Sequence, residues 1–183
     1  MKTLIAYFSM KGQTIAPGMK IVNLEKGHTA VVAETIQSAI GGDLFEMEII
    51  KTYNPDHMKM IYEAQDELKQ GIRPELKAYP ENLDQYDTVF LCYPNWWNTL
   101  PMPVLGFIER YDWNGKRIIP VNTSEGSGAG QSVQKIREVC KGAEVEASYE
   151  LIGSQVDSRI EEIRTWAKGK SKGNETENKR QYL

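Results

Sequence analysis

The feature that most constrains the fold is an apolar run that ends at a proline and precedes two adjacent tryptophans. Residues 88–93 are almost all apolar, and they follow the polar segment 81–87. A short, unbroken run of this kind is typical of a strand buried on both faces, as in a parallel sheet. Pro94 ends the run, because proline lacks the N–H that a strand ladder requires. The next loop carries Trp96 and Trp97, and two indoles at the end of a buried strand indicate a flat aromatic ligand.

Segments with the patterns of strands and helices alternate along the whole chain. Five segments have the apolar or alternating pattern of strands, namely 3–8, 44–50, 88–93, 116–122 and 147–152. Five others have apolar residues at helical spacing, namely 29–40, 58–69, 102–111, 132–139 and 155–167. Strands interleaved with helices in this way predict a doubly wound α/β sheet with helices on both faces.

Length and composition are those of one ordinary globular domain. The chain has 183 residues, of which 40% are apolar and 26% charged, and its formal net charge is −3. No apolar run approaches the roughly 20 residues of a membrane-spanning helix, and the acidic balance disfavours nucleic acid as a partner. The amino terminus has the pattern of a strand rather than a signal peptide. Cys92 and Cys140 lack metal-site spacing and are expected to be reduced thiols, so we expect a cytoplasmic protein.

The end of the chain differs in composition from the rest. Residues 168–183 contain five Lys/Arg, two Asp/Glu, two glycines and almost nothing apolar. Such a segment cannot bury a core of its own. The sequence therefore predicts one folded domain over residues 1–167 and a flexible, charged tail over 168–183.

The segment after the first expected strand predicts an anion site made of two parts. In an open parallel sheet, ligands bind beside the carboxyl ends of the strands, where the strand order reverses. Ser9 lies at that position, but Pro17-Gly18 prevents a continuous helix from starting near it. We therefore expect Ser9 and the helix terminus at 27–30 to form the anion site together, with residues 10–26 looping out between them. The alternative is an ordinary capped helix with a surface insertion.

The segment after the fourth expected strand is rich in glycine. Residues 122–130 hold three glycines within five positions. Glycine allows the backbone to approach a ligand closely, and successive N–H groups can form a nest that attracts anions. Together with the anion site and the tryptophans, this loop predicts a site for a phosphorylated, flat, hydrogen-bonding heterocycle.

These segments resemble the three FMN-binding loops of the flavodoxin-like flavoproteins. The resemblance is carried by Tyr7-Phe8-Ser9, Gly27-His28-Thr29, Tyr93-Pro94-Asn95-Trp96-Trp97 with Pro101-Met102-Pro103, and Thr123-Ser124-Glu125-Gly126-Ser127-Gly128. The Pro-x-Trp-Trp loop resembles a bacterial branch of that superfamily. The match covers residues 1 to about 167 in order. It implies three α/β/α layers, a five-stranded parallel sheet of order 2-1-3-4-5, and non-covalently bound FMN.

The resemblance also implies a role for each loop. The phosphate would be held by the split first loop, at Ser9, Lys11, His28, Thr29 and Ala30. The isoalloxazine would be flanked by the second loop, at Pro94, Asn95, Trp96 and Trp97. Its pyrimidine side would be lined by the third loop, at Thr123, Ser124, Glu125, Gly126, Ser127 and Gly128. The chain departs from the family pattern in the first loop, because residues 10–26 divide the usual compact turn.

Two redox functions fit these features. The first is a one-electron carrier of the flavodoxin type, which docks transiently on a redox partner protein. The second is an FMN-dependent enzyme that passes hydride from NAD(P)H to a quinone or a similar small-molecule acceptor. Electron-carrying flavodoxins tend to be strongly acidic. The tail contributes +3 to the net charge, which leaves only −6 for residues 1–167, so the carrier is favoured narrowly. A homodimer is compatible with either function.

Other classes of site are disfavoured by the residues present. A non-redox receiver module of the response-regulator type needs aspartates at positions where this chain has Ser9 and Asn95. The sequence shows no Ser-His-Asp grouping, no metal-ligand cluster and no paired acid–base carboxylates. His57 is interpreted as a surface loop residue, and no catalytic side chain is predicted.

Overall fold

The buried run at 88–93 becomes the centre of a parallel sheet. A computed structural model describes residues 1–180 of the chain. Strand β5 (Thr88–Pro94) pairs in parallel with β1 (Thr3–Tyr7) on one side and with β6 (Arg117–Ser124) on the other. Its side chains alternate between two cores, with Phe90 and Cys92 in one and their neighbours in the other. The prediction of a strand buried on both faces is confirmed.

The sheet has the predicted strand order. The edge beyond β1 is formed by β4 (Asp43–Glu46), which is shorter than the predicted strand at 44–50. The other edge is divided between β7 (Glu144–Val145) and β8 (Tyr149–Ile152), which both pair with β6 in parallel. The order β4-β1-β5-β6 followed by β7 and β8 corresponds to 2-1-3-4-5. Each strand ends at the same edge of the sheet, because all of these pairings are parallel.

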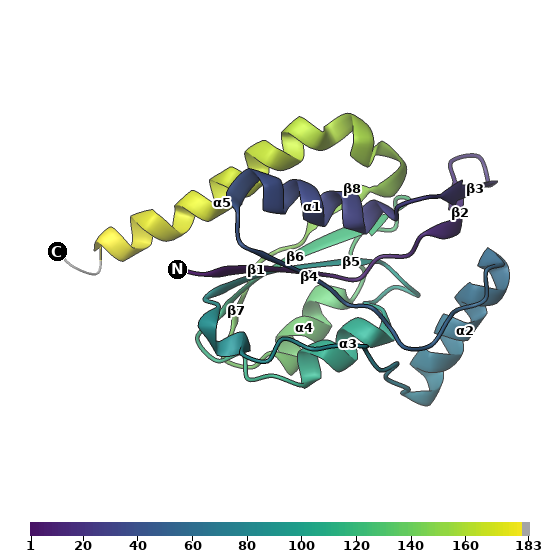
Figure 1. Cartoon of the computed structure of the whole chain (residues 1–183), viewed down its shortest axis with the longest axis horizontal. Coiled ribbons are helices and arrows are strands. Elements are labelled where there is room, and N and C mark those ends of the chain that lie inside the picture. The colour runs from purple at the N-terminus through teal and green to yellow at the C-terminus, as the bar shows by residue number, and fades with distance from the viewer. Residues whose placement is uncertain (181–183) are drawn as a thin grey trace.

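Helices cover both faces of the sheet, as the alternating pattern predicts. Figure 1 shows α1 (His28–Ile40) and α5 (Ile160–Arg180) on one face, and α3 (Met102–Glu109) and α4 (Ser132–Val139) on the other. Helix α2 (His57–Gln70) lies at one end of the molecule, beyond the carboxyl ends of the strands (Figure 1). Two 3-10 helices, Leu83–Gln85 and Gly153–Arg159, complete the elements found in residues 1–180. Across residues 1–180, no helix has the length and apolar character needed to cross a membrane.

Residues 10–26, which we expect to loop out between Ser9 and the helix terminus, contain a β-hairpin. Strands β2 (Gly12–Ala16) and β3 (Lys20–Leu24) pair antiparallel around the turn Pro17-Gly18-Met19. Gly18 has a φ of 79°, a left-handed value that glycine adopts without the penalty paid by other residues. Pro17-Gly18 therefore ends one strand and starts the return strand. The hairpin lies at the same end of the molecule as α2 (Figure 1).

Helix α5 continues past the predicted domain boundary. The sequence placed its end at residue 167, but the helix runs to Arg180, in a segment of Lys, Glu and Asn without proline. Lys170 forms an ion pair with Glu146, and its carbonyl accepts a hydrogen bond from Arg117 Nη1 at 3.1 Å. These contacts attach the start of the predicted tail to the domain. Residues 181–183 lie outside the described residues, and the flexibility of the tail stays a prediction.

Both cysteine thiols are buried, and we expect them to be inert in the folded protein. Cys92 and Cys140 are free and essentially inaccessible to solvent. Burial raises the pKa of the Cys92 thiol strongly and that of Cys140 to about 12, so little of the reactive thiolate forms. Ellman's reagent at mildly alkaline pH should label neither thiol in native protein and both after denaturation. Rapid labelling of native protein would contradict the burial described here.

Candidate functional site

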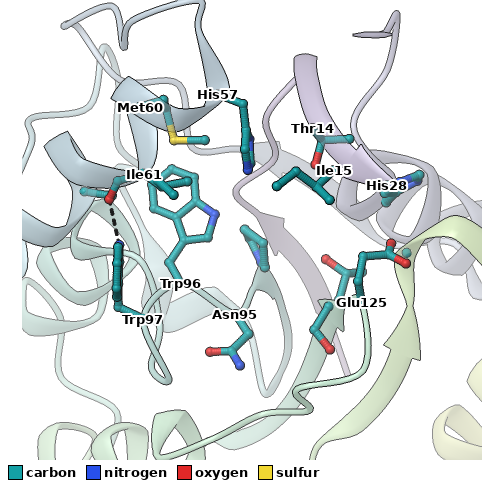
Figure 2. Close-up of a pocket in the computed structure, with 15 residues that line it drawn as sticks. Thr14, Ile15, His28, His57, Met60, Ile61, Asn95, Trp96, Trp97 and Glu125 are labelled. Atoms are coloured by element: carbon teal, nitrogen blue, oxygen red, sulfur yellow. Dashed lines mark hydrogen bonds between the residues drawn. The ribbon is translucent and has the colours of Figure 1, made fainter. Parts of the chain in front are cut away.

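The three predicted loops meet at the carboxyl edge of the sheet, beside a cavity of about 350 Å³. Figure 2 shows the side chains that surround it. The volume falls in the range of small-molecule sites, roughly 300–1,000 Å³. Eight lining residues lie in the predicted loops, namely His28, Pro94, Asn95, Trp96, Trp97, Thr123, Ser124 and Glu125. The others come from the hairpin, from α2 and from the turn after β8, namely Thr14, Ile15, His57, Met60, Ile61, Ala64 and Gly153.

The first loop contacts the terminus of α1, as the composite anion site requires. The Ala30 N–H donates to Ser9 Oγ at 3.1 Å, so Ser9 caps a helix that begins nineteen positions later in the chain. Gly27 makes this approach possible: a Cβ there would lie 2.2 Å from Ser9 Oγ and 2.4 Å from the Met10 carbonyl oxygen. The structure therefore brings Ser9 and the 27–30 turn together. Phosphate binding by this pair stays a prediction.

Direct hydrogen bonds connect the first, second and third loops. Thr29 is buried, and its hydroxyl lies 2.8 Å from the Thr123 hydroxyl. The Asn95 N–H donates to the Thr123 carbonyl at 2.9 Å, and the Asn95 amide donates to Ser127 Oγ at 2.9 Å. Thr123 is thus the common partner of the other two loops. These bonds fix the loops relative to one another without any ligand.

The two tryptophans have different surroundings. Trp96 is half-buried and contacts Phe8 and Tyr53 edge-on, with ring centroids 5.3 and 5.5 Å apart. Trp97 is 40% exposed, and its Nε1 donates to the Ile61 carbonyl at 2.7 Å, which ties the loop to α2 (Figure 2). Trp97 therefore does not pack into the core. Both rings line the cavity.

The glycine-rich third loop lines the cavity only through its first three residues. The N–H groups of Gly126 and Gly128 donate to Ser124 Oγ at 3.3 and 3.0 Å. The Ala129 N–H donates to the Glu150 carboxylate at 3.2 Å, so this carboxylate takes the place expected for a ligand anion. The open backbone nest that we predicted is therefore filled by side chains. A serine hydroxyl competes effectively for nearby N–H groups in a turn, which is the physical reason for the difference.

Glu125 is held by the turn that follows β8. Its carboxylate accepts hydrogen bonds from Ser154 N at 2.8 Å and from Ser154 Oγ at 2.7 Å. Glu125 is exposed, but these two bonds hold its carboxylate against the turn after β8. It lies at the wall of the cavity, and among the described residues that line this cavity it is the sole carboxylate (Figure 2).

A second cavity, of about 850 Å³, lies next to the first. Of the residues predicted to hold phosphate, Ser9, Lys11 and Ala30 line this second cavity, whereas His28 lines the first. The two predicted parts of the site thus face adjacent cavities. His57 and Met60 line both. A ligand that contacts both the tryptophans and the α1 terminus must therefore extend across the edge that the two cavities share, at His57 and Met60.

The contribution of α2 and of the hairpin to the cavity is not predicted from the sequence. His57 is the first residue of α2 and lines the cavity, so its interpretation as a surface loop residue is wrong. Asp56, whose side chain accepts the Lys59 N–H at 3.0 Å, is the capping signal that could have placed the helix start here. Within the described residues, two buried polar atoms at this cavity have no hydrogen-bond partner, His57 Nδ1 and Asn95 Oδ1. The same residues include no cluster that could hold a metal ion.

Comparison with known proteins assigns the chain to a family. The sequence profile of the flavodoxin family matches residues 2–169. A candidate flavoprotein from Bacteroides uniformis ATCC 8492 is 27% identical, with a TM-score of 0.69 over 91% of this chain and 97% of that one. One from Bacteroides eggerthii DSM 20697 is 28% identical, with a TM-score of 0.67 over 88% and 97%. A flavoprotein from Lactobacillus acidophilus NCFM, solved in complex with FMN, shares the fold at 23% identity, with a TM-score of 0.59 over 86% and 97%. A search of functionally curated proteins gave no significant match. The chain belongs to the flavodoxin family.

Proposed function

We propose that this protein binds one FMN non-covalently and carries electrons to a redox partner protein. The observation that carries the proposal is the contact between Ser9 and the α1 terminus, beside a cavity with an aromatic wall. A helix terminus attracts an anion, and an aromatic wall suits a planar ring. Membership of the flavodoxin family and the FMN bound by the Lactobacillus flavoprotein support the same ligand.

The residues present fit the phosphate group of FMN. The first N–H groups of a helix have no intrahelical partners, and the helix dipole favours negative charge there. Ser9 would add a hydroxyl donor from the opposite side, and Lys11 would add a positive charge from the hairpin root. Gly27 keeps this space free of a side chain. Together these groups would bind a phosphate dianion more tightly than they would bind a neutral hydroxyl group in its place.

The residues of the neighbouring cavity fit the flavin ring. Trp96 is held in one orientation by Phe8 and Tyr53, so its position does not depend on the ligand. Among the described residues, buried Asn95 Oδ1 has no hydrogen-bond partner, and a ring that carries an N–H group would satisfy it. When bound, FMN supplies the redox chemistry, and the protein binds, orients and tunes it.

Removing the charge of Glu125 should make the bound flavin easier to reduce fully. Glu125→Gln deletes a negative charge at the cavity wall, and that charge disfavours the anionic reduced flavin. We expect the potential of the second reduction step to rise by roughly a few tens of millivolts, and by less at high salt. Redox titrations of both proteins at low ionic strength measure the difference. An unchanged potential with tight FMN binding would leave the tuning to backbone groups.

A second candidate function is that of an FMN-dependent NAD(P)H oxidoreductase. It is favoured by the apolar side chains that α2 and the hairpin add to the cavity, namely Ile15, Met60 and Ile61. Such walls suit a small organic acceptor. The two functions differ in how the flavin is reduced. Anaerobic mixing of the FMN-loaded protein with NADPH should leave the flavin absorbance unchanged if the protein is a carrier. Rapid bleaching would contradict the carrier and support the enzyme.

A further inference from the structure

Both histidines of the chain face the same cavity, and each is the first residue of a helix. The sequence contains two histidines, His28 at the start of α1 and His57 at the start of α2. Both line the 350 Å³ cavity. Figure 2 shows the His57 ring pointing from α2 into this space, between Met60 and Ile15. Between these two apolar side chains, the His57 imidazole has few protein groups with which it can form hydrogen bonds (Figure 2).

The position of His57 is fixed, but its ring is not satisfied. Its backbone N–H donates to Gln13 Oε1 at 3.2 Å, which attaches the start of α2 to the hairpin. Its Nδ1 is buried and has no hydrogen-bond partner within residues 1–172, whose side chains the structure describes. Buried polar atoms are nearly always hydrogen-bonded, and an exception calls for a specific explanation. A ligand that supplies the missing partner is such an explanation.

We propose that His57 Nδ1 hydrogen-bonds the ring system of the bound flavin, which makes α2 a cofactor-binding element in addition to the three loops. The inference rests on the FMN site proposed above. The isoalloxazine carries carbonyl oxygens and ring nitrogens as acceptors, and an N–H group as a donor. Neutral imidazole has one donor and one acceptor nitrogen, so either tautomer finds a partner on the ring. His57 is thus a contact residue of the cofactor.

The affinity of FMN for His57 variants tests this contact. His57→Leu keeps the bulk of the side chain but removes its polar atoms, and should raise the Kd for FMN about five- to tenfold. His57→Asn places a polar atom close to the position of Nδ1 and should stay within about twofold of wild type. Lys59→Ala, an exposed change in the same turn of α2, is the matched control and should bind FMN as wild type does. Circular dichroism and thermal unfolding check that each variant is folded.

Proton NMR supplies a readout that does not depend on affinity or activity. With two histidines in the chain, the imidazole region contains few signals, and the spectrum of His57→Asn assigns them. Adding FMN to the apoprotein should shift the His57 signals. Wild-type affinity in His57→Leu, or His57 signals that FMN does not move, would overturn this inference alone. Failure of the wild-type protein to bind FMN would overturn the proposed function and this inference together.

Discussion

Replacing Gly27 by alanine is expected to lower FMN affinity by about 100-fold or more. The backbone at Gly27 is extended, with φ of −65° and ψ of 149°, so alanine is allowed there conformationally. The obstacle is space, because the new Cβ would lie 2.2 Å from Ser9 Oγ and 2.4 Å from the Met10 carbonyl oxygen. The hydroxyl can rotate, but the carbonyl belongs to the backbone. The first loop must therefore move away from the helix terminus.

The size of the effect follows from the bonds that this movement breaks. A hydrogen bond to a charged group contributes about 1.5–3 kcal/mol, and losing two of them at the phosphate weakens binding by ~100-fold or more. Overpacking should also lower the free energy of unfolding of the apoprotein by about 1–3 kcal/mol. Flavin fluorescence titration and urea unfolding measure the two quantities.

Gly169→Ala is the matched control for Gly27→Ala. Gly169 lies in α5, and a Cβ there would meet no atom of the described residues within 4 Å. Alanine has the higher helix propensity, so this variant should be as stable as wild type or slightly more stable, with unchanged FMN affinity. A Gly27→Ala protein that binds FMN like wild type would show that the α1 terminus does not hold the phosphate.

Trp96→Ala should weaken both the fold and FMN binding. The indole packs edge-on against Phe8 and Tyr53 while it lines the cavity. Truncating a large aromatic side chain costs about 3–5 kcal/mol when it is fully buried, and Trp96 is half-buried, so we expect about 2–3 kcal/mol. The loss of the aromatic wall should lower FMN affinity by roughly tenfold, since one aromatic contact contributes about 0.5–1.5 kcal/mol beyond burial.

Trp97→Phe serves as the comparison for Trp96→Ala. It keeps an aromatic ring at the cavity and removes the Nε1 donor that binds the Ile61 carbonyl. We expect a loss of about 1 kcal/mol in stability and a small change in affinity. If Trp96→Ala lost stability while the folded fraction kept wild-type FMN affinity, Trp96 would be a core residue and not part of the binding site.

The sheet and its helices could be predicted from the sequence because their signals are local. The run at 88–93 is apolar on both faces, and α4 was placed at 132–139, where the structure has it. The contact between Ser9 and the 27–30 turn was also inferred, since Pro17-Gly18 prevents any nearer helix start. The resemblance to the flavodoxin-like loops then implied which residues at each strand end form the FMN site. These features follow from patterns within about 20 residues of sequence.

The parts of the site that could not be predicted depend on contacts between segments that are distant in the sequence. Pro17-Gly18 reads locally as a break in a helix, whereas the β-branched pairs on either side, Thr14-Ile15 and Ile21-Val22, favour a hairpin. His57 follows a proline and an aspartate, which is typical of a surface loop, and only the packing of α2 turns it toward the cavity. Glu150 reaches the third loop from the neighbouring strand β8, so the filling of the nest could not be read from residues 122–130.

The central claim, that the split first loop and the α1 terminus hold the phosphate of FMN, is tested most directly by comparing FMN with riboflavin. The two molecules share the ring and differ in the phosphate, so the ratio of their Kd values isolates the anion site. Titration of the same apoprotein with each, followed by flavin fluorescence or calorimetry, should give one FMN per chain and an affinity for FMN at least about 100-fold higher. Equal affinities would contradict the account.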